Sequence, residues 1–121
     1  MSFNFNGDTP IYLQIIEHIK MQIISKKYLP GQKLPSVRDF SLEFQVNPNT
    51  VQKALSELEN TGLIYTERTN GKFVTGDAAL VKELTDMTLS SMVRDFYSVM
   101  TRMGISREEI TEILKRESEK L

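Results

Sequence analysis

Amide, hydroxyl and cationic side chains recur on one face of the segment that follows Asn47-Pro48. A helix turns by about 100° per residue, so these side chains fall opposite the apolar positions of the same segment. They are Asn49, Gln52, Lys53, Ser56 and Asn60. Amides pair with adenine through two hydrogen bonds, and lysine reaches guanine or phosphate. Because this face carries no carboxylate, we interpret it as a surface for nucleic acid; a merely polar, solvated face is the alternative that this helix alone leaves open.

Further cationic groups fall on the same side of the predicted fold. Arg38 lies in the first turn of the preceding helix, where the positive end of the helix dipole and the hydroxyl of Ser36 favour a phosphate. Arg68 and Lys72 flank the tip of a predicted hairpin, and Gly71 offers a backbone without a side chain to block a groove. Each arginine taken alone is explained as an ordinary solvent-exposed residue. The convergence of these groups on one side of the predicted fold favours a polyanionic partner.

Other chemistries find no support in the residue types. The chain has no cysteine, which removes disulfides, thiol catalysis and zinc sites with cysteine ligands. We interpret His18, its one histidine, as a partly exposed helix residue, because no second metal ligand accompanies it. The glycines are scattered singly, and carboxylate pairs such as Glu57 and Glu59 lack the desolvation that a catalytic pKa requires. We therefore expect no enzyme, no cofactor and no metal site.

Composition and charge are those of an ordinary globular chain. Of its 121 residues 40% are hydrophobic and 26% charged, which indicates one compact domain or a small domain with a helical appendage. The net charge of −1, from 15 basic and 16 acidic residues, argues mildly against a nucleic-acid partner. No run approaches the roughly 20 apolar residues of a membrane span, and the N-terminus lacks a signal-peptide pattern. We expect a cytoplasmic protein.

The polar face must be positioned by a core, and the first element of that core is a helix before Pro30-Gly31. Asp8-Thr9-Pro10 predicts an N-cap followed by proline at the first helical position. Isoleucine then recurs every four residues, which is typical of a helix buried along one side. The stripe is Ile11, Ile15, Ile19 and Ile23, flanked by Tyr12 and Ile16.

Two capped helices joined by a very short connection are predicted next. Ser36, with Asp39 three residues later, is in position for a capping box. Gln45-Val46 is the connection, and Asn47-Pro48 predicts an N-cap and a first helical residue. Thr61-Gly62 ends the second helix. The buried positions are Val37, Phe40 and Phe44 in the first helix and Val51, Ala54, Leu55 and Leu58 in the second.

A β-hairpin completes this part of the chain. Two β-rich runs, 63–68 and 72–75, surround Thr69-Asn70-Gly71, and Asn-Gly between such runs is a strong hairpin signal. Helix, helix, tight turn, helix and hairpin is the plan of a winged helix-turn-helix. We predict a mainly α fold with a small β-hairpin (α+β): a winged helix-turn-helix domain over 1–76 and a helical dimerisation segment over 77–121.

The C-terminal segment is helical and changes its apolar face. A long helix is predicted from about Ala78 to Met103, before Gly104, and a short one opens at Ser106 with Glu109 in capping-box position. Three early apolar residues share one side, which we expect to pack on the winged domain: Leu80, Leu84 and Met87. The later ones lie well over 90° round the helix, where we expect a partner chain: Leu89, Val93, Phe96, Met100 and Met103.

Several ordered motifs together resemble a known family. They are Pro10-Ile11-Tyr12, the PGQKLPSVRDF run over 30–40, the NPNTVQKALSELENTGLI run over 47–64, and the Arg68…Gly71…Phe73-Val74 hairpin. Over roughly residues 9–75 the sequence resembles the DNA-binding domain of the GntR family of bacterial transcription regulators. The NPNT variant and the short tail resemble the YtrA-like subfamily, whose small C-terminal helical pair serves dimerisation.

The resemblance implies roles for individual positions. The arginine that matches Arg38 contacts DNA in the family, as do residues at the start of the recognition helix, here Asn49, Thr50 and Gln52. The glycine at the hairpin tip, here Gly71, approaches the minor groove.

The sequence thus predicts a homodimeric, sequence-specific repressor that binds a palindromic operator in double-stranded DNA, with half-sites one helical turn or a multiple apart. Lysines would mainly hold phosphates, and Arg38, Asn49 and Gln52 would mainly read bases. The candidate DNA contacts are Lys33, Ser36, Arg38, Asn47, Asn49, Thr50, Gln52, Lys53, Arg68, Gly71 and Lys72. The near-neutral charge leaves open a second function, a winged-helix module that docks proteins without binding nucleic acid. No small-molecule effector is assigned.

Overall fold

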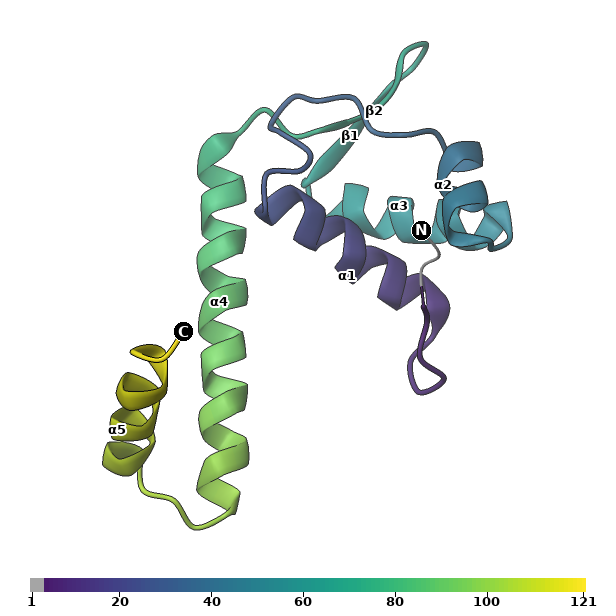
Figure 1. Ribbon diagram of the computed structural model, residues 1–121. Helices are drawn as coiled ribbons and strands as arrows, with labels where there is room; N and C mark the ends of the chain where they lie inside the picture. The colour runs from purple at the N-terminus through teal and green to yellow at the C-terminus, as the bar shows by residue number, and fades with distance from the viewer. Residues whose placement is uncertain (1–3) are drawn as a thin grey trace. The chain divides into compact units, whose positions relative to one another are not determined.

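The computed structural model describes residues 4–121 and has the predicted fold class, mainly α with a small β-hairpin (Figure 1). The elements are α1 (Ile11–Ile24), α2 (Val37–Phe44), α3 (Pro48–Asn60), β1 (Ile64–Glu67), β2 (Gly71–Val74), α4 (Ala78–Arg102) and α5 (Arg107–Ser118). The chain forms two compact units, one that ends at Leu84 and one over Thr85–Leu121. No helix within the described residues is both long and apolar enough to cross a lipid bilayer.

The first unit is built around α1, which packs against α3. Ile15, Ile19 and Ile23 are fully buried, as their four-residue spacing predicts, whereas Ile11 at the start of the stripe is 42% exposed. All four predicted apolar positions of α3 are fully buried as well. The core comprises Ile15, Ile19, Ile23, Leu34, Phe40, Phe44, Val51, Ala54, Leu55, Leu58, Leu63, Ile64, Val74 and Val81.

The first turns of α4 also belong to this unit. Val81 is fully buried in the core, Leu84 packs against it, and Leu80 Cδ2 lies beside Gly62. Leu80 and Leu84 thus lie where the early stripe of this helix predicts them. Met87, the third member of that predicted stripe, belongs to the second unit and is 62% exposed. Val81, which lies between the first two members along the chain, is the better buried residue.

The start of α1 differs from the prediction. Pro10, with φ −52° and ψ 139°, takes the N-cap position without a side-chain hydrogen bond, so neither Asp8 nor Thr9 is the cap and Pro10 is not the first helical residue. Asn6 Oδ1 instead accepts hydrogen bonds from the backbone N–H groups of Asp8 and Thr9, which satisfies these donors before the helix begins. The Gln14 side chain donates to the carbonyls of Asn6 and Thr9, and accepts from the backbone N–H of Asn6.

Two predicted helix starts and one predicted stop are confirmed between α2 and β1. Ser36 and Asp39 form the capping box of α2, and the Asn47 side chain caps α3 with Pro48 at its start. Gly62, with φ +84°, follows the end of α3. The connection between α2 and α3 turns at Gln45, whose φ of +56° lies in the left-handed region that glycine adopts at lower cost.

The hairpin loop lies one residue earlier than the predicted connection over residues 69–71. Glu67 pairs with Gly71, so Gly71 is the first residue of β2 and the three residues 68–70 form the loop. The N–H of Asn70 donates to the Glu67 carbonyl at 3.1 Å, and the φ of +105° at Gly71 returns the chain to the strand. The segment before α2 extends the pairing, because Leu34 donates to the Lys72 carbonyl and Val74 donates to that of Gln32.

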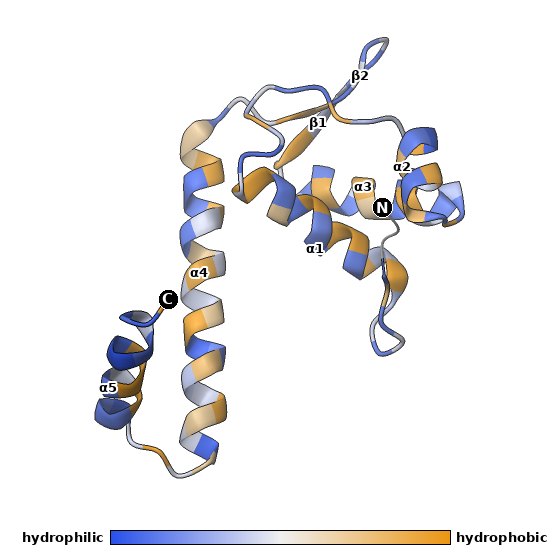
Figure 2. Ribbon diagram, viewed as in Figure 1, coloured by the Kyte–Doolittle hydropathy of each residue, from blue (hydrophilic) through white to orange (hydrophobic). Residues whose placement is uncertain are grey.

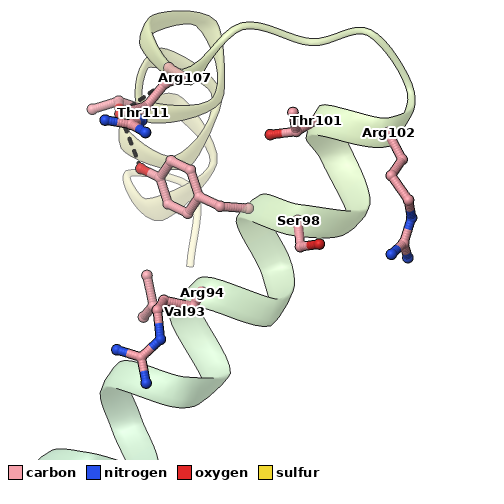
Figure 3. Close-up of a pocket in the computed structure, with 8 residues that line it drawn as sticks. Val93, Arg94, Ser98, Thr101, Arg102, Arg107 and Thr111 are labelled. Carbon is pink, nitrogen blue, oxygen red and sulfur yellow. Dashed lines mark hydrogen bonds between the residues drawn. The ribbon is translucent and has the colours of Figure 1, made fainter.

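The second unit is a helical hairpin in which α5 folds back beside the end of α4 (Figure 1). Ile110 of α5 is fully buried, Leu114 is 38% exposed, and Ser106 caps the helix by accepting from the N–H of Glu109. A hydrogen bond of 2.9 Å joins the Tyr97 hydroxyl to Thr111 across a cleft of about 600 Å³ (Figure 3). Figure 2 shows that α5 is predominantly hydrophilic.

A pH dependence of stability follows from His18. Its ring lies edge-on to Phe44, with ring centroids 5.4 Å apart, and burial lowers the pKa of His18 from 6.5. Glu43 opposes this shift and Lys27 adds to it. The unfolded chain therefore takes up the proton more readily, so this contribution to the free energy of unfolding is complete above about pH 6.5 and is lost as the pH falls.

We expect His18→Gln to flatten this part of the pH profile. The free energy of unfolding in urea, measured at pH 7.5 and 5.5, should fall less between the two pH values in the variant than in the unmodified protein. The carboxylates titrate in both proteins and cancel in the comparison. An equal fall in both would contradict the assignment.

Candidate nucleic-acid interface

The outer face of α3 carries the predicted polar strip. Asn49, Gln52 and Lys53 are exposed, as are Ser56 and Asn60, opposite the fully buried side of the helix. Gln52 Nε2 donates to Ser56 Oγ at 3.4 Å, a bond between two exposed groups one helical turn apart. The strip therefore consists of solvent-facing donors and acceptors on one rigid element.

Two candidate residues serve as helix caps. Asn47 Oδ1 accepts from the N–H of Asn49 at 2.7 Å, and Ser36 Oγ accepts from the N–H of Asp39 at 3.0 Å. Asp39 in turn accepts from the N–H of Ser36. A carboxylate thus already lies at the N-terminus of α2, where the sequence predicted room for a phosphate, and Asn47 and Ser36 act first as supports for the helix starts.

Four candidate cations have no carboxylate partner among residues 4–121: Lys33, Arg38, Lys53 and Arg68. All four are exposed and belong to the first unit. Free side chains of this kind retain their full charge for an external anion. These four side chains are therefore available to an external anion although the overall charge of the chain is −1.

Lys33 and Gly71 meet near the loop end of the hairpin, where Gly71 begins β2. Lys33 forms an isolated β-bridge with Phe73, and a Cβ atom built on Gly71 would lie 3.2 Å from Lys33 Cε. The missing side chain at Gly71 thus makes room for the lysine stem, as well as permitting the positive φ. Sequence reasoning identified Gly71 but not this neighbour, because the contact joins segments far apart in the chain.

Lys72 differs from the four free cations. Its ammonium lies 2.8 Å from Thr66 Oγ1 and 3.8 Å from Glu59 Oε1, and Thr66 also donates to Glu59. The Lys72 side chain is only 16% exposed. This network ties both strands of the hairpin to the last turns of α3, so in the free protein Lys72 fixes the hairpin rather than presenting a free charge.

Tyr12, which the sequence analysis placed beside the apolar stripe and in a family motif but not among the candidate contacts, lies next to the polar strip. Lys53 Nζ lies 3.9 Å from the centroid of its ring, within the range of a cation–π interaction. Tyr12 and Lys53 share a shallow groove with Ile11, Asn49 and Thr50. No spacing rule links Tyr12 to Lys53, because their proximity depends on how α1 crosses α3.

The residues that the structure describes contain no group of three or more histidine, cysteine, aspartate or glutamate side chains able to hold a metal ion. The exposed side chains of the first unit present hydrogen-bonding groups and positive charge. Such a surface is able to bind an extended anion and to form hydrogen bonds with the edges of bases.

Comparison with known proteins gives a family match. Residues 11–74 match the model of the bacterial regulatory proteins of the gntR family. The chain is 39% identical over 115 residues to YhcF of Bacillus subtilis, an uncharacterised HTH-type transcriptional regulator, with 95% of each sequence covered. It is 35% identical over 110 residues to the HTH-type transcriptional repressor YtrA of the same organism, covering 90% of this chain and 85% of YtrA.

Solved structures agree with this match. A GntR family transcriptional regulator from Listeria monocytogenes superposes with a TM-score of 0.88 at 38% identity, covering 93% of this chain and 98% of that one. The AraR DNA-binding domain in complex with operator ORX1 gives a TM-score of 0.57 at 30% identity, covering 62% of this chain and 95% of that domain.

The role of Asn47 as the cap of α3 can be tested by substitution. Asn47→Ala should lower the free energy of unfolding by about 1 kcal/mol, because the N–H of Asn49 loses its acceptor, whereas Asn47→Ser should retain most of it. Chemical denaturation of the two variants tests this. Equal stability of the alanine and serine variants would show that the cap is energetically silent.

Proposed function

The chain belongs to the gntR family of bacterial regulatory proteins, and from that premise we propose that it is a homodimeric repressor of a palindromic operator. Family membership makes it a transcriptional regulator with a DNA-binding domain and not an enzyme. The finer proposal is carried by one observation, the exposed strip of α3 accompanied by four cations without carboxylate partners. The name of YtrA as a repressor supports repression, and the operator complex of the AraR domain supports operator binding.

In this proposal residues 1–76 bind DNA and α3 enters the major groove. Asn49 and Gln52 read base edges, where an amide pairs with adenine through two hydrogen bonds. Arg38 supplies a bidentate donor, and Thr50 contributes its hydroxyl from the start of α3. The hairpin approaches the neighbouring groove with Arg68 in its exposed loop, beside Lys33 and Gly71. Lys72 supports this arrangement by fixing the hairpin to Glu59.

The proposed dimer forms through residues 77–121, by way of a stripe on α4. Six apolar side chains fall within about 120° of helix surface and are each 45% or more exposed. They are Leu89, Met92, Val93, Phe96, Val99 and Met103; Met100 lies within the same arc and is partly buried. The sequence prediction named four of these six and missed Met92 and Val99. An exposed apolar stripe of this length is costly in water and is typical of an interaction surface.

A second copy of the chain is the partner we assign to this stripe. A two-fold pairing presents the same surface from both subunits, which suits a continuous stripe along one helix. A two-fold dimer would also explain a palindromic operator.

Matched methionines on opposite faces of α4 test the dimer. Met92→Glu, within the stripe, should shift the protein from dimer to monomer in sedimentation equilibrium, because a carboxylate would be buried without a partner. Met87→Glu is the control: Met87 is at least as exposed, at 62% against 55% for Met92, but lies outside the stripe. Retention of the dimer by the Met92 variant would refute the assignment, as would its loss in the control alone.

DNA binding is tested by its salt and sequence dependence. The Kd is measured at several salt concentrations on a duplex that the protein selects from a random library. We expect log Kd to rise linearly with log salt concentration, since each phosphate contact releases counterions. Gln52→Ala should relax the preference at one base pair, costing about 1–3 kcal/mol there, whereas Lys33→Met should weaken all sequences alike. A docking module without nucleic-acid binding would enrich no duplex at all.

A further inference from the structure

We propose that α1 and α3 together form a binding groove for one DNA backbone phosphate, in which Tyr12 is a positioning residue that holds Lys53 in place. The inference rests on the proposed function and extends it to a residue outside the helix-turn-helix. The groove has a volume of about 430 Å³ and is lined by Ile11, Tyr12, Asn49, Thr50 and Lys53.

The geometry singles out Lys53 among the free cations. Lys33, Arg38 and Arg68 form no cation–π interaction within residues 4–121, whereas the ammonium of Lys53 lies 3.9 Å from the ring centroid of Tyr12. The ring fixes one side of the ammonium by the cation–π attraction and leaves its remaining N–H donors directed away from the ring. An anion can therefore approach from the open side of the groove.

The neighbouring side chains supply neutral donors for the same anion. Neither the Asn49 amide nor the Thr50 hydroxyl forms a hydrogen bond with any residue of the described chain, and the groove has no carboxylate in its lining. A cation, an amide and a hydroxyl at one concave surface match the needs of a phosphodiester oxygen. The groove is continuous with the polar strip of α3, because Asn49 and Lys53 belong to both, which selects a DNA phosphate as the occupant.

Holding the lysine matters because its side chain is long. A free lysine gives up rotamer freedom when it binds an anion, and this cost opposes affinity. Tyr12 restricts Lys53 before DNA arrives, so less freedom remains to be lost on binding. The effect acts through Lys53, which makes it measurable as a coupling between the two positions.

The test is a double-mutant cycle on a fluorescein-labelled duplex, selected from a random library by the unmodified protein. Tyr12→Leu should weaken binding by roughly two- to fivefold for each subunit bound, the range expected for an exposed cation–π pair. Tyr12→Phe keeps the ring and should bind as the unmodified protein does. Lys53→Met should reduce the slope of log Kd against log salt by about 0.9 for each phosphate that the variant no longer neutralises. In the Lys53→Met background, Tyr12→Leu should have no further effect.

Thermal unfolding of each variant separates a folding defect from a binding defect, and Lys53→Met, an exposed substitution, is the reference for an intact fold. The proposal is overturned if Tyr12→Leu and Lys53→Met weaken binding additively, or if Tyr12→Phe binds as poorly as Tyr12→Leu. An unmodified protein that binds no duplex would overturn the proposed function and this groove with it. Normal binding with an additive cycle would remove only the role of Tyr12.

Discussion

The packing of α1 against α3 is the constraint on which the rest of the first unit depends. Ile15, Ile19 and Ile23 enter one core cluster with the buried side of α3. Because α1 and α3 each bury a single stripe, the opposite side of α3 faces solvent. Its polar residues therefore lie together on one exposed surface. The same contact carries Tyr12 to Lys53. A hydrophobic interaction therefore sets the geometry of a polar surface, and loosening it would disperse that surface without any change to the polar residues themselves.

Local rules predicted the helices, and they failed where a partner came from elsewhere in the chain. Periodicity alone located the four buried residues of α3, and capping chemistry located its start at Asn47 and its end before Gly62. The predicted start of α1 was wrong because Asn6 and Gln14 hold the backbone of the segment before the helix in a turn, and Pro10 rather than a polar residue takes the N-cap position. The pairing of Lys72 with Glu59 lay beyond prediction, since a sequence pattern gives the face of a residue but not the neighbour across the core.

Net charge is a poor guide to this interface. The whole chain has a charge of −1, yet carboxylates neutralise its cations unevenly. Glu59 is bound to Lys72, while Lys33, Arg38, Lys53 and Arg68 remain unpaired within residues 4–121. A weak overall field gives little non-specific attraction to DNA, because that attraction depends on the number of phosphates neutralised. A regulator with this distribution must rely on contacts that form only when its surface is correctly docked, which favours discrimination between sequences over affinity for all of them.

Such a strategy would make the proposed dimer a requirement for tight binding. One subunit with few cations gains modest free energy from a half-site, but two linked subunits bind the second half-site at high effective concentration. Discrimination between DNA sequences also increases, because a base substitution in both half-sites costs binding free energy twice. This gives a physical reason for the exposed stripe of α4, which a monomer would bear as an unfavourable apolar surface. Its early turns bury Val81 in the first unit and its later turns leave Phe96 exposed, so one helix contributes to a core and carries the proposed interface. In the proposed dimer, the change of apolar face along α4 is therefore the sequence feature that would join DNA recognition to assembly.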